Sequence, residues 1–123
     1  MQGYEKIEKA WGHEEIYINN EHYCMKRLIV NVNHQCSLHR HLKKHETFLV
    51  EMGTGIIEVG DERFIAHPGG IIAIPPGTWH RFANFGRDVL VLREISTHHD
   101  DTDVERQFPS GKIPFLPAGT LSE

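Results

Sequence analysis

Three histidines and one glutamate in this chain have the types and spacing of ligands for one divalent metal ion. His39, His41 and Glu46 lie in one short run, and His80 lies in a second run that begins at Gly69. Residues i and i+2 of a β-strand face the same side, so His39 and His41 can reach one ion together. Imidazole and carboxylate ligands suit borderline divalent ions such as manganese, zinc, iron or nickel. We therefore predict one divalent metal ion as cofactor; histidines that only decorate a strand surface are the alternative.

Cysteine usage favours a functional ion over a structural one. Closed structural sites have four tight ligands, which are often cysteines, and none of the four residues above is a cysteine. Cys24 and Cys36 show no CxxC spacing. We expect these two thiols to be free and buried.

Short strands separated by turns must position the ligands. The expected strands are Glu14–Ile18, Tyr23–Val30, Ser37–His41, Thr47–Glu51, Gly55–Val59, Arg63–Ile65, Ile71–Ile74, Trp79–Ala83 and Val89–Ile95. Gly60 and Asp61 are typical of a tight hairpin turn. No long segment has helical periodicity, so the pattern predicts an all-β sandwich or barrel.

Length and charge limit the classes of partner. A chain of 123 residues predicts one domain. The net charge is −4 with histidine neutral, and no stripe of lysine and arginine stands out, so nucleic acid is not an expected partner. No apolar run approaches the length of a membrane span, and the N-terminus lacks a signal-peptide pattern. We expect a cytoplasmic protein with no membrane partner.

The segment 24–96 resembles the cupin superfamily, because both motifs of that superfamily occur here in order. The first motif runs from His39 to Gly53 and the second from Gly69 to Asn84, and together they contain all four usual ligand types. The resemblance implies a double-stranded β-helix, which is a jelly-roll barrel, with the metal inside the barrel near one mouth.

The same resemblance implies the organisation of the chain. We expect a single cupin domain over residues 1–123, with the barrel core at about 11–96 and a C-terminal tail at 107–123. A homodimer is also implied, with the apolar run Ile71–Ile74 or the early strands as candidate interfaces.

Several segments resemble the cupin domain of type II mannose-6-phosphate isomerases. They are Trp11-Gly12-x-Glu14, Lys26–Val30, Ile74–Arg81, Glu94 in the last strand and Asp103–Arg106. That group commonly has glutamine at the position of His39, whereas His39-x-His41-x-Lys43 is similar to D-lyxose isomerase cupins. The resemblance implies a small-molecule partner that is a sugar or a sugar phosphate, and leaves open which of the two.

The chemistry implied is metal-dependent aldose–ketose isomerisation through an enediolate. A base must remove a proton beside a carbonyl, and Glu94 is our candidate, with Lys26 as electrostatic or acid partner. Strand alternation puts Lys26 on one face with Leu28 and Val30, and Glu94 on one face with Leu90 and Leu92. Inward charges in a small barrel are costly without a role. Outward, solvated charges are the alternative for both.

Four residues are candidates for substrate binding: Tyr17, Lys43, Trp79 and Arg106. Trp79 either stacks on a sugar face or packs in the barrel. Tyr17 either lines the pocket or is a half-buried residue on a strand. Lys43, beside Lys44, draws an anionic substrate to the mouth or belongs to a charged turn. Arg106 binds a phosphate or carboxylate, or forms a surface salt bridge.

Two polar segments near the ligands need separate interpretations. His45 should point away from the ion, because neighbouring residues on an extended segment alternate. The segment His98–Asp101 is either a second metal site or a polar loop after the last strand, and we favour the loop.

Two other functions compete with the isomerase. A metal-dependent dioxygenase is one, since three histidines and a glutamate also hold iron in several cupin dioxygenases. A carbohydrate-binding cupin without turnover is the other. Iron with oxygen uptake distinguishes the first, and ligand affinity without turnover distinguishes the second.

Overall fold

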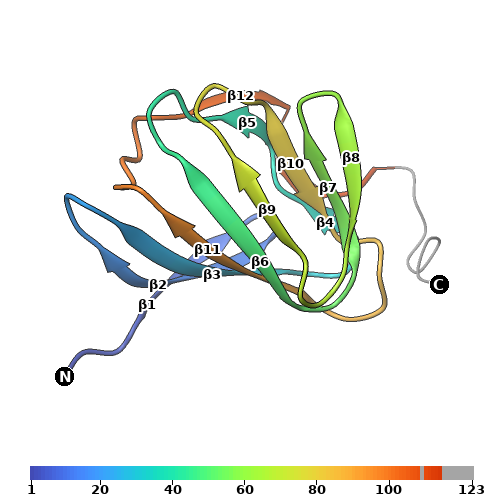
Figure 1. Ribbon diagram of the computed structural model, residues 1–123. Coiled ribbons are helices and arrows are strands. Elements are labelled where there is room, and N and C mark those ends of the chain that lie inside the picture. The colour runs from blue at the N-terminus through green and yellow to red at the C-terminus, as the bar shows by residue number, and fades with distance from the viewer. Residues whose placement is uncertain (109, 115–123) are drawn as a thin grey trace.

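The computed structural model, described here for residues 1–108 and 110–114, is a barrel of two antiparallel β-sheets that face each other (Figure 1). The first sheet has the order β1 (Glu5–Lys9), β2 (Gly12–Asn19), β3 (Cys24–Val30), β11 (Leu90–Ser96), β6 (Glu46–Met52), β9 (Ile71–Ile74). The second sheet has the order β12 (Glu105–Phe108), β5 (Leu38–Arg40), β10 (His80–Ala83), β4 (His34–Gln35), β13 (Gly111–Lys112). Two further strands belong to it: β7 (Gly55–Val59) pairs with β10, and β8 (Glu62–Ala66) pairs with β7. The described residues include no helix that could cross a membrane.

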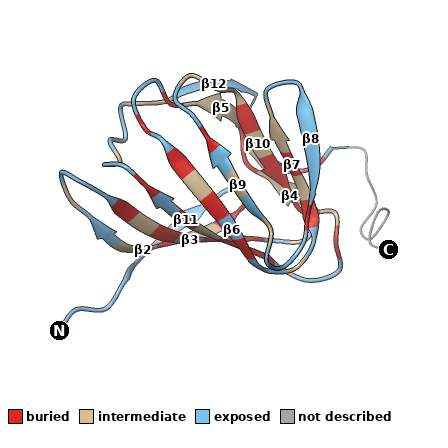
Figure 2. Ribbon diagram, viewed as in Figure 1, coloured by how far each residue is buried: buried red, intermediate tan, exposed pale blue. Residues whose placement is uncertain are grey.

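Inward-facing apolar side chains fill the space between the sheets. Leu28 pairs in register with Leu92, and Val30 with Leu90, and all four are at most 2% exposed. The rest of this core includes Trp11, Phe48, Val50, Ile57, Ile74 and Phe82. Buried and exposed positions alternate along these strands (Figure 2), as a barrel with one buried face per strand requires.

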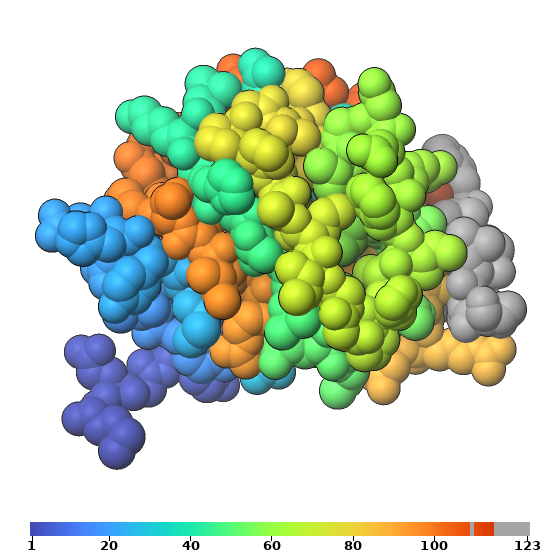
Figure 3. Space-filling model, viewed as in Figure 1, coloured from blue at the N-terminus to red at the C-terminus, as the bar shows by residue number. Residues whose placement is uncertain are grey.

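Strands β6, β8, β9 and β11 lie together on one outer face of the molecule (Figure 3). Several apolar side chains of these strands are exposed: Leu49, Met52, Phe64, Ile65, Ile71 and Ile95. Within the run Ile71–Ile74, Ile71 is 70% exposed whereas Ile74 is 2% exposed.

The expected strands are present, with ends that shift by at most two residues, and Gly60–Asp61 forms the expected turn between β7 and β8. The sequence did not predict β1, β4, β12 and β13. The strands β4 and β13 have two residues each, and β12 is exposed at all four positions, so none has an apolar alternation to detect. They form because neighbouring strands pair with them.

The C-terminal segment needs a correction. Phe108 ends β12, β13 follows at Gly111–Lys112, and Ile113 is 5% exposed, so the start of the expected tail belongs to the barrel. The sheets therefore extend beyond 11–96 at both ends. The remainder of the expected tail, 115–123, lies outside the described residues.

Candidate metal centre

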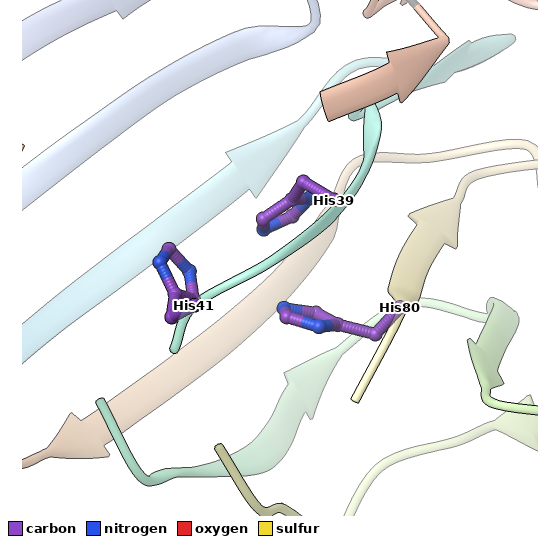
Figure 4. A group of neighbouring side chains, drawn as sticks. All are labelled: His39, His41 and His80. Atoms are coloured by element: carbon purple, nitrogen blue, oxygen red, sulfur yellow. The ribbon is translucent and has the colours of Figure 1, made fainter. Parts of the chain in front are cut away.

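Three histidines from neighbouring backbone segments converge inside the barrel. His39 lies in β5, His41 follows that strand by one residue, and His80 begins β10 in register with His39. Figure 4 shows the three rings directed toward one point. The ring centroids of His39 and His80 are 4.2 Å apart, and one ligand atom from each residue lies within 4.8 Å of the others. The predicted geometry of i, i+2 ligands is therefore present.

Each of the three imidazoles has one nitrogen held by a backbone carbonyl. The Nδ1 to oxygen distances are 2.7 Å for His39 to Ser37, 2.6 Å for His41 to Asp103 and 2.9 Å for His80 to Thr78. A carbonyl oxygen only accepts hydrogen bonds, so each Nδ1 donates its hydrogen. Each Nε2 then keeps a free lone pair, as a metal ligand requires.

Burial keeps two of these rings neutral. Loss of water contact lowers the pKa of His39 to about 3 and that of His41 to about 4. Near neutral pH both rings are uncharged, which is the form that binds metal.

Glu46 approaches this cluster from the side of His80. Its Oε2 is 2.9 Å from Nε2 of His80 and 3.7 Å from Nε2 of His41. Glu46 Oε2 and His80 Nε2 are both buried without a hydrogen-bond partner. Two electron-pair donors that face each other this closely fit a cation that both would bind, so the residues present suit a divalent ion.

The backbone connects the two ligand runs. Gly77, three residues before His80, has φ +81°, a value that favours glycine, and its N–H donates to the carbonyl of His41 at 2.6 Å. This turn sets where the strand with His80 begins relative to His41.

Lys44 is a buried cation that links the cluster to Glu94. Its Nζ lies 3.1 Å from Glu46, 3.0 Å from Glu94 and 3.0 Å from Nδ1 of His99, so all three of its hydrogens have acceptors. Because Nδ1 of His99 accepts, Nε2 carries the hydrogen and donates to Asp101 at 2.8 Å. Burial opposes a charge on Lys44, but Glu94 and Glu46 raise its pKa above the usual range.

The same ion pair acts on Glu46. Burial alone would raise the pKa of the Glu46 carboxyl, but the positive charge of Lys44 holds it below the usual range. Glu46 is therefore a carboxylate near neutral pH.

A cavity of about 120 Å³ opens beside the cluster and brings the candidate base into the same space. Lys26 and Glu94 are paired in register on β3 and β11, line this cavity, and are 2% and 3% exposed. The alternative of outward, solvated charges is therefore wrong for both residues. Glu14 completes this wall, with its Oε1 at 3.4 Å from Nζ of Lys26.

Of the four residues expected to bind substrate, only Arg106 lines this cavity. Tyr17 lies away from it and donates to Glu15 at 2.7 Å. Trp79 packs against the guanidinium of Arg40, 4.7 Å from its ring.

Alternation explains two of these misplaced residues. Lys43 is exposed, whereas Lys44 lies on the inward side with Glu46. Trp79 precedes the inward His80 and so points elsewhere. Tyr17, Lys43 and Trp79 therefore lie outside the cavity beside the histidine cluster.

The two polar segments follow the favoured interpretations. His45 is exposed and does not join the cluster. His98 contacts the carbonyl of Asn20 at 2.8 Å, and His99 contacts Lys44, so they point to different places. Among residues 1–108 and 110–114, the only group of metal-ligand side chains is the one formed by His39, His41 and His80.

Sequence reasoning missed two residues of the site, Lys44 and Asp103. For Lys44 the signal was strand alternation. Lys44 lies two residues before Glu46 and therefore faces the same side, whereas His45, between them, faces away from the ion. For Asp103 the only signal was the resemblance of the segment Asp103–Arg106, which gives no contact, since the contacts of Asp103 with His41 and the following residues join segments about sixty positions apart.

Comparisons with known proteins agree with this geometry. A family model described as a cupin domain matches residues 27–96. A mannose-1-phosphate guanylyltransferase from Sinorhizobium fredii is 33% identical over 89 residues, which are 72% of this chain and 17% of that protein. This chain thus spans less than a fifth of that relative's length. A D-lyxose ketol-isomerase from Thermofilum sp. is 27% identical over 128 residues, covering 82% of this chain and 71% of that protein.

Solved structures give the same fold. The structure of a cupin-2 domain protein from Rhodospirillum rubrum matches with a TM-score of 0.68 at 18% identity, covering 79% of this chain and 64% of that one. At this identity the likeness concerns the fold alone.

Proposed function

We infer that this chain, which belongs to the cupin domain family, is a metal-dependent aldose–ketose isomerase of a sugar or sugar phosphate. One observation carries the proposal: a buried carboxylate, Glu94, and a buried ammonium, Lys26, line the same cavity as His39 and His41. Buried charges of both signs beside a metal-ligand cluster are typical of sites that move protons. The printed name of the Thermofilum relative, a ketol-isomerase, supports this class.

Four side chains would hold the ion: His39, His41, Glu46 and His80. A divalent ion bound there supplies Lewis acidity that polarises a carbonyl oxygen of the substrate. The lone pairs on Nε2 and the ionised Glu46 need no proton to leave before the ion binds.

Glu94 is the proposed base, which would take the proton from the carbon beside the carbonyl and return it to the neighbouring carbon. The contact of its Oε2 with Lys44 at 3.0 Å fixes the direction of the carboxylate. A buried carboxylate held by a cation can accept a proton without first leaving a full hydration shell.

Lys26 is the proposed electrostatic partner. Among the described residues its ammonium contacts the Glu14 carboxylate at 3.4 Å and no other acceptor, so donors remain for a substrate oxygen. This separates Lys26 from Lys44, whose three hydrogens are all engaged. Negative charge that develops on the substrate oxygens would be stabilised by Lys26.

The substrate-binding role of Arg106 remains part of the proposal. Arg106 and Lys9 both line the cavity and are otherwise exposed, so they add positive charge at its solvent side. An unphosphorylated sugar or a sugar phosphate can occupy such a site, and the assay below includes both.

The test uses protein purified without a histidine tag. Its metal content is measured, and the metal-loaded protein is incubated in D₂O with aldoses, ketoses and their 6-phosphates. We expect one divalent ion per chain and deuterium at C2 of one sugar. Glu94→Gln should keep the ion and lose the exchange, whereas Glu62→Gln, an exposed change on β8, should retain both.

Other results would replace the proposal. Bound iron with oxygen uptake and no exchange would identify a dioxygenase. Sugar affinity without exchange in any substrate would identify a binding protein. Full exchange by Glu94→Gln would overturn the assignment of the base.

We also propose that the chain forms a homodimer, as the resemblance to cupins implies. Light scattering coupled to size-exclusion chromatography should give twice the chain mass, and a mass equal to one chain would contradict it.

A further inference from the structure

Asp103 makes four hydrogen-bonding contacts with the loop that carries the metal ligands. Its carboxylate accepts the N–H of Leu42 at 2.8 Å, that of Lys43 at 3.2 Å and that of Lys44 at 3.1 Å. Its backbone carbonyl accepts Nδ1–H of His41 at 2.6 Å. One residue therefore contacts four consecutive positions of the segment between β5 and β6.

These contacts have a direct physical effect on the cluster. Three consecutive N–H groups that converge on one carboxylate form an anion-binding backbone arrangement, which fixes the conformation of the loop. The carbonyl fixes the tautomer and the ring orientation of His41, so its Nε2 points to the other two histidines. The same loop leads into Lys44 and Glu46, so its conformation also sets where those side chains begin.

Asp103 is itself held in place. Its N–H donates to the carbonyl of Asp100 at 2.9 Å. The segment before Asp103 makes two further contacts. The N–H of Thr97 donates to the carbonyl of His45, in the ligand loop, at 3.0 Å. The side chain of Asn19, in β2, donates to the carbonyl of His99 at 2.9 Å. A fixed acceptor is required if Asp103 is to orient His41 rather than follow it.

His41 differs in this respect from the other two histidines. His39 and His80 each donate to the carbonyl two residues earlier in their own segments, Ser37 and Thr78. Only His41 depends on a residue 62 positions away. A change at Asp103 should therefore disturb one ligand and the loop after it, and leave the other two ligands in place.

We propose that Asp103 is a positioning residue of the metal centre, which orients His41 and shapes the loop from His41 to Glu46 without contacting the ion. This inference rests on the proposed metal site.

The experiment compares three variants with the wild type, with Zn²⁺ alone as the probe and a chelating dye as competitor. Asp103→Ala should weaken Zn²⁺ binding about 10- to 100-fold, the usual effect of removing a residue that orients a ligand. Asp103→Asn keeps one acceptor oxygen and should fall between. Asp100→Ala is the matched control, because the Asp100 carboxylate contacts Thr102 and not the ligand loop, and its affinity should stay within about twofold of wild type.

A second readout uses metal-free protein. Amide hydrogen exchange at Leu42, Lys43 and Lys44 should accelerate in Asp103→Ala, because the variant loses the carboxylate that accepts these three N–H groups. His41 should keep its Nδ1–H tautomer in long-range ¹⁵N–¹H spectra, because the variant keeps the backbone carbonyl at position 103. Unchanged exchange at the three amides would overturn the role of Asp103, and so would loss of the Nδ1–H form, since His41 would then depend on the carboxylate rather than on the carbonyl. An equal loss of Zn²⁺ affinity in Asp100→Ala would also overturn it, since the segment as a whole would then be responsible.

The two readouts separate this inference from the proposed function. If the wild type binds no Zn²⁺ or other divalent ion, the metal centre itself is refuted, and the exchange data still decide whether the Asp103 carboxylate shapes the loop from His41 to Glu46.

Discussion

Replacing Lys44 with methionine removes an ammonium group from the interior and keeps most of the side-chain stem. Lys44 is 3% exposed, and its partners Glu46 and Glu94 are 2% and 3% exposed. In Lys44→Met these two carboxylates lose the cation that both contact at about 3 Å. Only protonation of a carboxylate or uptake of another cation can then compensate.

The expected size of the effect follows from this burial. Breaking a buried ion pair by removing one partner costs about 3–5 kcal/mol, because an uncompensated charge remains. For a chain of this length that corresponds to a fall in Tm of about 10–25 °C. Total stabilities are about 5–15 kcal/mol, so the variant should fold but with a much smaller margin.

The loss should depend on pH in a defined direction. In the wild type, Lys44 helps to hold the pKa of Glu46 below its usual range. Its contribution is therefore complete above the pKa of an unfolded glutamate, about 4.3, and is lost as the pH falls through the folded value. The Tm difference between wild type and Lys44→Met should therefore be full at pH 7 and shrink only as the pH falls below about 4.3.

Thermal unfolding followed by circular dichroism at several pH values measures this difference. Lys43→Met is the matched control, since Lys43 is the exposed neighbour in the same turn, and its Tm should stay within a few degrees of wild type. The reasoning fails if Lys44→Met loses no more than Lys43→Met, or if the gap between wild type and Lys44→Met does not narrow at low pH. Added Zn²⁺ should raise the Tm of Lys44→Met more than that of the wild type, because the ion supplies positive charge beside Glu46.

Two further predictions concern titratable groups in the barrel. Burial lowers the pKa of His39 to about 3 and that of His41 to about 4, so both rings should remain neutral at pH 5.5 in metal-free protein. Movement of their Cε1–H NMR signals between pH 7.5 and 5.5 would contradict this expectation. Cys36 is 3% exposed, and burial raises its pKa to about 12. Cys24 is fully buried, and burial raises its pKa as well. Neither thiol should therefore react with a disulfide reagent at pH 8 until the protein is denatured.

The sequence predicted the ligand cluster because its information is local. The i, i+2 spacing of His39 and His41 needs only a strand. The same alternation placed Lys26 and Glu94 on faces shared with apolar residues, and the structure shows that these faces are buried. Applied consistently, alternation also separates Lys44 from Lys43 and His80 from Trp79.

Other parts of the site depend on contacts between distant segments, and no local pattern reveals those. The strand β12 is exposed and polar, and it is a strand because Arg106 pairs with His39 and Glu105 with Arg40. That pairing brings Arg106, a candidate for substrate binding, to the cavity, although no strand was expected in this segment. Tyr17 lies outside the cavity for a related reason, since an aromatic residue on a half-buried strand does not indicate which face it occupies.

The long separation between His41 and its acceptor has a consequence for the order of events during synthesis. All four proposed ligands lie at or before residue 80, so they leave the ribosome before the segment that contains Asp103. A nascent chain that ends after β11 can pair its ligand strands and orient His39 and His80 from their own segments, while the ring of His41 still lacks its carbonyl. In the proposed metal centre, full affinity for an ion would therefore require that the segment containing Asp103 has left the ribosome.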